Sequence, residues 1–364
     1  MKNFKIKKFC KYEIFNKQVI ILVLFILFII SVFNYLINPY NIFKQRFLPD
    51  TFLKADAKIQ ERLTKPIGLK FDKRKIDTIF IGSSRVDLCI DKNDYKSLTN
   101  KNAENIAVGG VFPSEIIEMI DITKKIHPEI KNVFVGIDFE YFTGAEQEDD
   151  NRIKITNNPK LSTSEFCTSL LSINTTGTSF WTIFKNLFLS KQRTYYSSGV
   201  KFVFVNDNIS QEFQNTVTEY TSKYEKYYVD EEKINSLVLY LKQLEKDNKN
   251  VKLFIMPTHV TLQKLLYNSN QTQNYNYVKE ELSRYFEIYD FNYPNEYTKE
   301  TVKPDMKYFF DGSHATHYLS KIIISDLLSD KPNLARKITK NNVKQINNLF
   351  VQDIKNYEDL NNVI

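Results

Sequence analysis

Short apolar runs recur along the chain, with helical patterns between several of them, and they constrain the fold more than any other feature of the sequence. The runs cover residues 78–81, 105–108, 133–137, 251–256 and 286–291. Their lengths and their content of Val, Ile and Phe predict buried β-strands. Residues 114–126 and 231–247 carry apolar side chains at helical spacing. Because parallel neighbours need crossover connections, we expect an α/β fold with a doubly wound, three-layer parallel sheet.

The amino-terminal segment has no charged residue from Gln18 to Phe43, and Val, Ile, Leu and Phe make up most of it. About 20 apolar residues are enough to cross the hydrocarbon core of a bilayer. We therefore predict a transmembrane helix over residues 18–37. A buried core helix is the alternative, but the sequence has no second stretch of this kind for it to pack against.

Six lysines lie within residues 1–17, before the apolar segment. The positive-inside rule predicts that this tail stays in the cytoplasm and that the rest of the chain is exported. A cleaved signal peptide is a competing interpretation, but no small-residue cleavage site follows the apolar run. We therefore expect an uncleaved signal anchor that crosses the cell membrane once.

The pattern of apolar and polar residues divides the rest of the chain into three regions. Residues 38–75 indicate a juxtamembrane stem, residues 76–330 the sheet domain and residues 331–364 a helical tail rich in Lys and Asn. Within the domain, the rhythm of strands stops over about residues 140–230, a stretch too long for an ordinary connection. We expect a helical insertion there, which either caps the carboxyl edge of the sheet or packs elsewhere on the surface.

The net charge of +7 does not indicate a nucleic-acid partner. Residues 1–17 hold six lysines and Glu13, or +5, so only +2 remains for all the other residues. The exported part is therefore nearly neutral. It contains no basic stripe and no recognised nucleic-acid motif, so we predict that the protein does not bind nucleic acid.

Two short segments far apart in the sequence supply the groups of a Ser-His-Asp site. Residues 79–85 predict a buried strand that ends in a tight turn carrying Ser84, and residues 309–314 place Asp311 three positions before His314. A serine hydroxyl becomes an effective nucleophile when an imidazole takes its proton, and a carboxylate orients that imidazole. We expect Ser84 at the carboxyl end of its strand, in the crevice where open α/β sheets bind ligands.

These segments resemble the first and last sequence blocks of the SGNH/GDSL hydrolase superfamily. Gly82-Ser83-Ser84 matches the Gly-Asp-Ser block, with Ser83 in place of the usual aspartate. The segment from Asp311 to His314 matches the Asp-x-x-His block. The resemblance covers roughly residues 76–330, the whole of the predicted sheet domain. It implies a flavodoxin-like three-layer fold in which Ser84 is the nucleophile, His314 the base and Asp311 its carboxylate.

Two further blocks of the superfamily bear on the binding of an oxyanion. The segment that ends in Gly109-Gly110 resembles the block that supplies a glycine amide, which implies Gly110, rather than Gly109, as a donor beside the amide of Ser84. The Gly-x-Asn-Asp block is matched poorly, because Asp138 stands near the position of the expected asparagine. An ionised carboxylate cannot donate a hydrogen bond and repels an oxyanion.

The Gly-Ser-Ser start, the Asp-Gly-x-His end and the membrane anchor most resemble the envelope-polymer branch of the superfamily. That branch includes the teichoic acid D-alanine transfer protein and the alginate-type polysaccharide O-acetylation proteins. The resemblance implies an acyl esterase or acyltransferase, without a cofactor, that uses an acylated envelope polymer or acyl donor. It also implies a polytopic membrane acyltransferase as a partner. A non-catalytic assembly protein with the same fold is the rival hypothesis, and Asp138 favours it.

Other residues leave alternatives open. The sequence has four histidines, of which His127 precedes Pro128 and is expected to face solvent. His259 follows a predicted strand at the same edge of the sheet, so it contacts substrate or has a structural role. Arg85 follows the nucleophile and either binds an anionic substrate or pairs on the surface.

A metal site is not predicted. Asp311, His314 and His317 form an Asp-x-x-His-x-x-His pattern, but no further ligand is apparent and the usual helical pair of histidines is four apart. The three cysteines are too scattered for a disulfide scaffold or a zinc site, although a bond between Cys89 and Cys167 stays open.

Overall fold

The computed structural model of the protein describes residues 2–40, 43, 48, 52–54, 61–70, 72–147, 163–188, 194–196, 201–202 and 208–357. The chain forms two compact units. One, here called the helical unit, comprises Met1–Ile59, Lys160–Ser190 and Thr194–Gly199. The other, here called the sheet domain, comprises Gln60–Pro159, Lys191–Arg193 and Val200–Ile364. The sheet domain therefore begins before residue 76, the boundary that the sequence indicated.

The described part of the sheet domain is built on six strands in the order β3-β2-β4-β7-β8-β9. These are β3 (Asn102–Asn105), β2 (Ile76–Ile81), β4 (Asn132–Gly136), β7 (Asn250–Ile255), β8 (Ile288–Asp290) and β9 (Arg336–Ile338). The first five strands of that order pair in parallel, and β9 pairs antiparallel with β8. The predicted α/β fold is confirmed, and the parallel strands have the doubly wound order 2-1-3-4-5. The antiparallel edge strand was not predicted, and it makes the sheet mixed.

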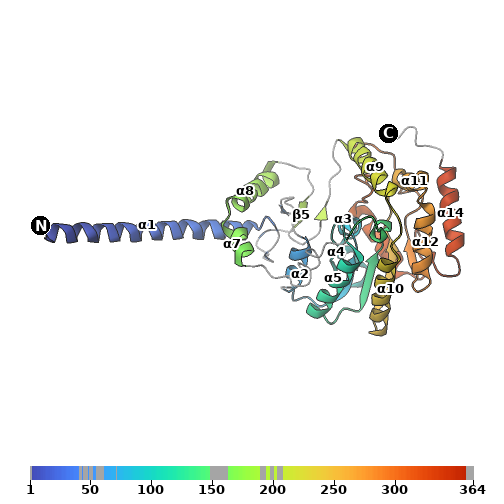
Figure 1. Ribbon diagram of the computed structural model, residues 1–364, viewed down its shortest axis with the longest axis horizontal. Helices are drawn as coiled ribbons and strands as arrows, with labels where there is room; N and C mark the ends of the chain where they lie inside the picture. The colour runs from blue at the N-terminus through green and yellow to red at the C-terminus, as the bar shows by residue number, and fades with distance from the viewer. Residues whose placement is uncertain are drawn as a thin grey trace. The chain divides into compact units, whose positions relative to one another are not determined.

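A layer of helices covers each face of the sheet. Strand side chains alternate between the two faces, so apolar side chains on both faces need to be covered. Ile79 and Ile81 of β2 face one core, and Phe80 between them faces the other. The first core is covered by α5 (Pro113–Ile126), α10 (Glu231–Lys246), α12 (Thr272–Ser283) and α14 (Val343–Asn356). The second core is covered by α3 (Ser84–Cys89), α4 (Lys92–Thr99) and α13 (Ser320–Leu328). Figure 1 shows α5, α10, α12 and α14 side by side over one face of the sheet.

The strand β3 begins and ends three residues earlier than the strand predicted at residues 105–108. The chain beyond it still runs beside the end of β2. The amide of Ile106 donates to the carbonyl of Phe80 at 2.8 Å, and the amide of Val108 donates to that of Gly82 at 2.9 Å. These bonds lead the following turn to the carboxyl end of β2. The other four predicted strands, and the helices predicted at residues 114–126 and 231–247, agree with the structure within two residues at each end, whereas α1 begins 16 residues before the helix predicted at residues 18–37.

The connecting elements of the sheet domain surround the carboxyl edge of the sheet. They are α2 (Glu61–Lys70), η1 (Phe139–Phe142), β6 (Lys201–Phe202), α9 (Ile209–Glu225), α11 (Val260–Asn268) and η2 (His317–Leu319). Helix α2 lies in the segment predicted as a stem, yet it belongs to the sheet domain, where Arg62 forms an ion pair with Glu115 of α5. The remaining parts of the predicted stem, insertion and tail that fall on residues 41–42, 44–47, 49–51, 55–60, 71, 148–162, 189–193, 197–200, 203–207 and 358–364 lie outside the described residues.

The helical unit contains α1 (Lys2–Ile37), α7 (Thr163–Leu171) and α8 (Ile173–Phe188), with the antiparallel pair of β1 (Leu53–Lys54) and β5 (Thr194–Tyr196). The stretch Ile14–Ile37 of α1 is long and apolar enough to serve as a membrane anchor or as a signal sequence, and no other described helix meets that test. Helices α7 and α8 pack against the carboxyl-terminal end of α1 (Figure 1).

Candidate active site

Two glycines bring the start of α3 close to the sheet. A Cβ atom added to Gly82, which follows β2, would lie 2.5 Å from Cγ2 of Val86. One added to Gly136, at the end of β4, would lie 2.3 Å from the same atom, so both positions require glycine. Helix α3 therefore begins over the ends of β2 and β4, where the order of the parallel strands reverses. Ser84, its first residue, lies in the crevice where doubly wound sheets bind ligands.

Ser84, His314 and Asp311 form one line of hydrogen bonds. The hydroxyl oxygen of Ser84 is 2.8 Å from Nε2 of His314. On the other side of the ring, Nδ1 is 2.8 Å from Oδ2 of Asp311 and 3.0 Å from Oδ1. Because the carboxylate accepts a hydrogen bond from Nδ1–H, Nε2 offers its lone pair to the hydroxyl, which donates. The structure thus brings together the three residues that the two sequence segments supplied.

A tight loop holds the histidine and the aspartate in this arrangement. Phe309 and Ala315 form an isolated antiparallel bridge at its ends. The backbone amides of Ser313 and His314 donate to Oδ1 of Asp311 at 2.7 and 2.8 Å. Burial alone would raise the pKa of Asp311, but the charge and hydrogen bond of His314 and the two amides lower it below its ordinary value. The carboxylate therefore stays ionised at neutral pH and can stabilise a protonated imidazole.

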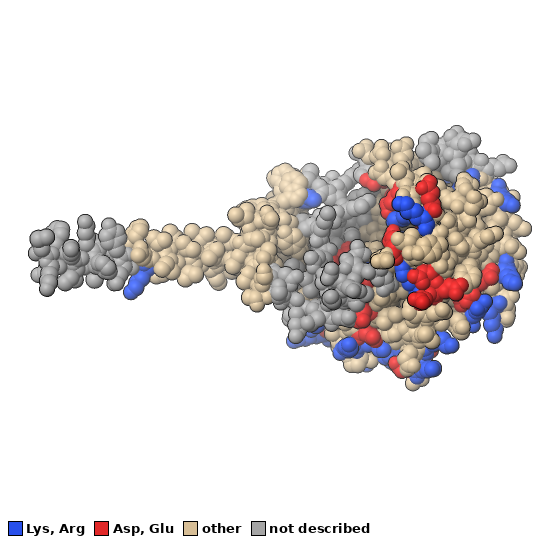
Figure 2. Space-filling view, in the orientation of Figure 1, with Lys and Arg blue, Asp and Glu red and all other residues tan. Residues whose placement is uncertain are grey.

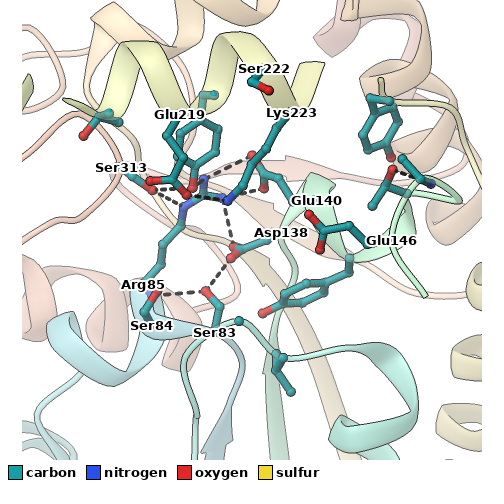
Figure 3. A pocket seen from close by; sticks show the side chains of 18 of the residues that line it. Ser83, Ser84, Arg85, Asp138, Glu140, Glu146, Glu219, Ser222, Lys223 and Ser313 are labelled. Atoms are coloured by element: carbon teal, nitrogen blue, oxygen red, sulfur yellow. Dashed lines mark hydrogen bonds and ion pairs between the residues drawn. The ribbon is translucent and has the colours of Figure 1, made fainter. Parts of the chain in front are cut away.

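Ser84 opens into a polar pocket of about 500 Å³. Its volume is within the range of small-ligand sites. One wall is α9, which contributes Thr216, Glu219, Tyr220, Ser222 and Lys223. This helix lies within the predicted insertion, for which the sequence left open a cap over the sheet or packing elsewhere. Figure 2 shows acidic and basic side chains next to one another around a hollow near α9, and Figure 3 shows the side chains of the pocket.

Arg85, which follows Ser84, is buried in the middle of a polar network. Its Nε donates to the hydroxyl of Ser313 at 3.1 Å. Its terminal nitrogens contact the carboxylates of Glu140 and Asp138 and the hydroxyl of Tyr220 at 3.0 to 3.3 Å. Burial alone would lower the pKa of Arg85, but the two carboxylates raise it well above its ordinary value.

Arg85 makes four hydrogen bonds within the protein and an ion pair with Asp138. Arg85 therefore joins α3 to α9, to the turn after β4 and to the loop that carries the imidazole. The sequence left open whether Arg85 binds an anion or pairs on the surface. The structure gives it a third role, as the buried centre of the network that positions the pocket walls.

Asp138, which stands near the position of the asparagine of the superfamily, takes part in the same network. The hydroxyl of Ser83 donates to its Oδ2, and its Oδ1 lies 3.3 Å from a terminal nitrogen of Arg85. Burial, the largest influence, and the charge of Glu140 raise the pKa of Asp138, while Arg85 opposes the shift. Figure 3 shows Asp138 between Ser83 and Arg85. Its charge is therefore opposed by a buried cation.

Tyr141 is a pocket residue that the sequence did not indicate. Its hydroxyl is buried close to Ser83 and makes no hydrogen bond of ordinary geometry within the described residues. Burial and the nearby carboxylate of Asp138 raise the pKa of Tyr141 well above its ordinary value, so the phenol keeps its proton. Buried polar groups in native proteins generally have a partner. The hydroxyl lies beside the side chain and the backbone of Ser83, on the lining of the same pocket as Ser84.

Gly110 lines the pocket and Gly109 does not. The backbone of Gly110 has φ of +58°, in the left-handed region that favours glycine. The carbonyls of both glycines accept hydrogen bonds from Arg62, and the amide of Gly109 donates to Glu61. The first helix of the sheet domain thus holds the turn in place, with Gly110 on the same pocket surface as Ser84.

The other histidines do not line the pocket. In His259, Nδ1 lies 2.9 Å from the hydroxyl of Thr261 and Nε2 lies 2.7 Å from the carbonyl of Glu300. Because both ring nitrogens are used and the ring is buried, the geometry supports the structural role for His259. The expectation that His127 faces solvent was wrong: the ring is buried, and the carboxylate of Glu129 and the carbonyl of Leu69 offer its nitrogens polar partners there.

Within the described ranges, no group of three His, Cys, Asp or Glu side chains is arranged to hold a metal ion. The ring of His317 stacks on that of Tyr318, with centroids 4.4 Å apart, and burial lowers the pKa of His317. Cys89 is buried, Cys167 is exposed, and both are free thiols.

Four features of the pocket could not be read from the sequence: the network around Arg85, the donor Tyr141, the wall formed by α9 and the contact of Ser83 with Asp138. The one signal that could have indicated the wall is the spacing of Thr216, Tyr220 and Lys223, which puts polar and aromatic side chains on one face of a helix.

The sequence was also compared with known proteins. No family model matches this chain. No curated protein matches it either. The arrangement of Ser84, His314 and Asp311 at the carboxyl edge of an α/β sheet is therefore the basis for a functional conclusion.

Proposed function

We propose that the protein is an acyl esterase or acyltransferase that forms an ester on Ser84 during its reaction. The observation that carries this proposal is the line of hydrogen bonds from Ser84 through His314 to Asp311, at the point of the sheet where ligands bind in doubly wound folds. The pocket beside the hydroxyl has room for a small polar group.

The proposed reaction has two steps, acylation and deacylation of Ser84, and His314 transfers the proton in both. Oγ of Ser84 attacks the acyl carbonyl carbon while Nε2 of His314 takes the hydroxyl proton, and Asp311 stabilises the imidazolium. The tetrahedral intermediate collapses, the alcohol leaves with the proton from His314, and the acyl group stays on Ser84 as an ester. Water or an acceptor hydroxyl then attacks this ester, and the same imidazole carries the second proton, which restores the free serine.

The oxyanion of the intermediate needs hydrogen-bond donors. We assign this role to the amides of Ser84 and Gly110 and to the hydroxyl of Tyr141, which all belong to residues of the pocket lining. A donor in such a site typically contributes a factor of about 10² to 10³ in turnover. Tyr141 supplies a neutral donor near the place where the superfamily has asparagine and where this chain has an acid.

The SGNH/GDSL superfamily is the family that we propose for the chain. The two departures from its motifs compensate each other in this interpretation. The superfamily has an acid before the nucleophile, where this chain has Ser83, and an amide near Asp138, where this chain has the acid. In this chain the carboxylate stands at the second of these positions, and the hydroxyl of Ser83 at the first donates a hydrogen bond to it.

We further propose that α1 is an uncleaved anchor, with residues 1–17 in the cytoplasm and the sheet domain outside the cell. An acylated envelope polymer or acyl donor is then the substrate within reach. The polar lining of the pocket supports a hydrophilic substrate, since Glu219 and Lys223 of α9 form an ion pair at 2.6 Å on its wall. A polytopic acyltransferase in the same membrane is the partner that the resemblance suggests.

A non-catalytic assembly protein remains the second candidate, because Asp138 places a carboxylate in the network beside the nucleophile. The two candidates differ in one testable respect. An enzyme needs the hydroxyl of Ser84, whereas an assembly protein needs only the folded surface around it.

The test is to replace Ser84 with alanine, which removes one small hydroxyl. We expect Ser84→Ala to abolish labelling of the purified full-length chain by a serine-directed fluorophosphonate. Turnover of acyl esters should fall by about 10⁴- to 10⁶-fold, as for the loss of a triad member. The ester content of the surface polymer in cells that express the variant at equal level gives the second measurement.

The matched control is Ser222→Ala, because Ser222 is an exposed serine on the α9 wall of the same pocket. This variant should label like the parent protein. A parent chain that does not react with the probe, together with normal polymer esterification by Ser84→Ala, would contradict the enzyme and support the assembly protein.

Replacement of Tyr141 by phenylalanine tests the oxyanion assignment separately. Tyr141→Phe keeps the nucleophile, so labelling should still go to completion, whereas turnover should fall by about 10²- to 10³-fold. The melting temperature of the variant reports any structural effect. Unchanged turnover in a variant that melts like the parent would remove Tyr141 from the oxyanion site.

A further inference from the structure

Helix α8 has its polarity reversed relative to a helix of a water-soluble protein. Its exposed apolar side chains recur at helical spacing and share one face: Ile173, Phe180, Trp181, Phe184, Leu187 and Phe188. The opposite face, which is buried, carries the hydroxyl side chains of Thr175, Ser179 and Thr182. Ile173 is 90% exposed, and Leu187 and Phe188 are each 69% exposed.

The buried hydroxyl face of α8 packs against the end of α1. Asn34 of α1 is fully buried, and its side-chain amide donates to the carbonyl of Leu170 at 2.8 Å and to the hydroxyl of Thr176 at 3.0 Å. Its side-chain oxygen accepts a hydrogen bond from Ser179 at 2.8 Å. Small residues and hydrogen bonds between helices are typical of contacts inside a membrane, where apolar side chains face lipid instead of the protein core.

The position of this contact on α1 places it at one end of the membrane span. A hydrocarbon core of about 30 Å takes about 20 residues of helix. Counted from the last lysine of the tail, Lys17, such a span ends near Ile37, and Asn34 lies one turn before that end. The exposed apolar surface of α1 extends to Val32, Tyr35 and Leu36, beside the helices α7 and α8 that contact it.

Charges are scarce on these two helices. The sequence of α7 and α8 contains only Glu165 and Lys185 as charged residues. Nζ of Lys185 lies 5.5 Å from the ring centroid of Trp181, and Trp with Lys is a pair typical of the border between lipid and water. Figure 2 shows the described atoms of α1 and of α8 almost wholly without charge.

From these observations we propose that α7 and α8 form a membrane-inserted hairpin whose apolar face lies in lipid, in the leaflet that surrounds the carboxyl-terminal end of α1. The exposed face of α8 therefore contacts the lipid acyl chains of that leaflet and the region where they meet the headgroups. The inference rests on the proposed membrane anchor, because its lipid surface continues that of α1. The hairpin gives the protein a second attachment beside a single helix.

The chain offers a built-in probe for this contact, because Trp181 is its only tryptophan. The experiment uses the purified full-length protein reconstituted in vesicles of phosphatidylcholine and phosphatidylglycerol. Vesicle flotation measures insertion of α1. Fluorescence of Trp181 is then measured with lipids brominated near the headgroup or near the chain ends, and with iodide in the water.

We expect the fluorescence of Trp181 to be severalfold lower in vesicles with brominated lipids than in unbrominated vesicles. The decrease should be largest for lipids brominated near the headgroup, and iodide should have little effect. In the variant Leu187→Asp/Phe188→Asp, which places two carboxylates on the apolar face, quenching by lipid should decrease and quenching by iodide should increase. Flotation of this variant should persist, because α1 is unchanged. The matched control Thr178→Ser, on the side of α8 away from the apolar face, should behave like the parent.

Each other result contradicts the proposal in a distinguishable way. Protein that floats while its Trp181 is quenched by iodide and not by lipid has α8 in water, which overturns the hairpin but not the anchor. Protection of Trp181 from both quenchers, with crosslinking between copies, would mean that a second copy of the chain covers the face. Protein that does not float would overturn the anchor and the hairpin together.

Discussion

Helices α8 and α9 come from the same predicted insertion, yet they bury opposite kinds of side chain. Helix α9 buries Phe213, Tyr220 and Tyr224 and exposes serine, glutamine and glutamate along its other side. Helix α8 buries hydroxyl side chains and exposes aromatic ones such as Phe184 and Phe188. Composition alone does not separate them, because both contain aromatic residues at helical spacing. The face that each helix buries does separate them, and it is the basis for proposing lipid around α8 and water around α9.

A pair of equal substitutions in the two helices gives the largest effect that tests this comparison. Phe213→Ala removes a buried ring that packs edge-on against His259 at 4.8 Å, so it should lower the free energy of unfolding by about 3 to 5 kcal/mol. Phe188→Ala removes an exposed ring and should change it by less than about 0.5 kcal/mol. Urea titrations of the full chain in detergent, followed by circular dichroism, measure both changes.

If the two alanine variants lose stability equally, the two helices do not differ in the kind of face that they bury. Such a result would mean that α8 buries its aromatic face within the protein in detergent. A folded control is available in Leu239→Ala, which shortens an exposed side chain of the sheet domain and should leave the midpoint within error.

The smaller test uses acid, because the helical unit contains no histidine and the buried face of α9 contacts one. Burial lowers the pKa of His259 from its ordinary 6.5 to about 4. Between these values the unfolded chain binds a proton that the folded chain does not, so stability falls as the pH falls from 6.5 towards 4. The full effect is about 3 kcal/mol at most.

Hydrogen exchange measured between pH 7 and 4, with intrinsic rates corrected for pH, should show α9 and α11 losing protection while α8 keeps it. His259→Asn removes the titrating group and should flatten the pH dependence of the urea midpoint. Equal loss of protection in α8 and α9 would show that the acid response does not come from His259.

The fold could be predicted largely from sequence because its central strands are short runs of buried Val, Ile and Phe, a pattern that needs no knowledge of tertiary contacts. Strand β9 was not predicted because Arg336 and Lys337 are charged and Ile338 alone is apolar. Only its pairing with β8 makes this segment a strand. Helix α2 was taken for part of a stem because its stabilising ion pairs connect it to distant residues such as Glu115.

The triad residues could be indicated from sequence because each half of the site is local. Asp311 and His314 lie in one loop, and Ser84 follows a recognisable strand and glycine. The network around Arg85 could not be indicated, because its partners Glu140 and Tyr220 come from segments whose approach depends on how the whole domain packs. A buried arginine and a surface arginine look the same in a sequence.

The wall formed by α9 has a consequence for how such a protein can diverge. Tyr220 and Tyr224 anchor the helix through hydrogen bonds to Arg85 and Glu140, whereas Ser222 points from the same helix without holding it in place. The proposed nucleophile Ser84 and its proposed base His314 lie on other elements. If the proposed reaction holds, substitutions at the exposed positions of α9 can change which substrate fits the pocket without altering the hydrogen bonds of Ser84, His314 and Asp311.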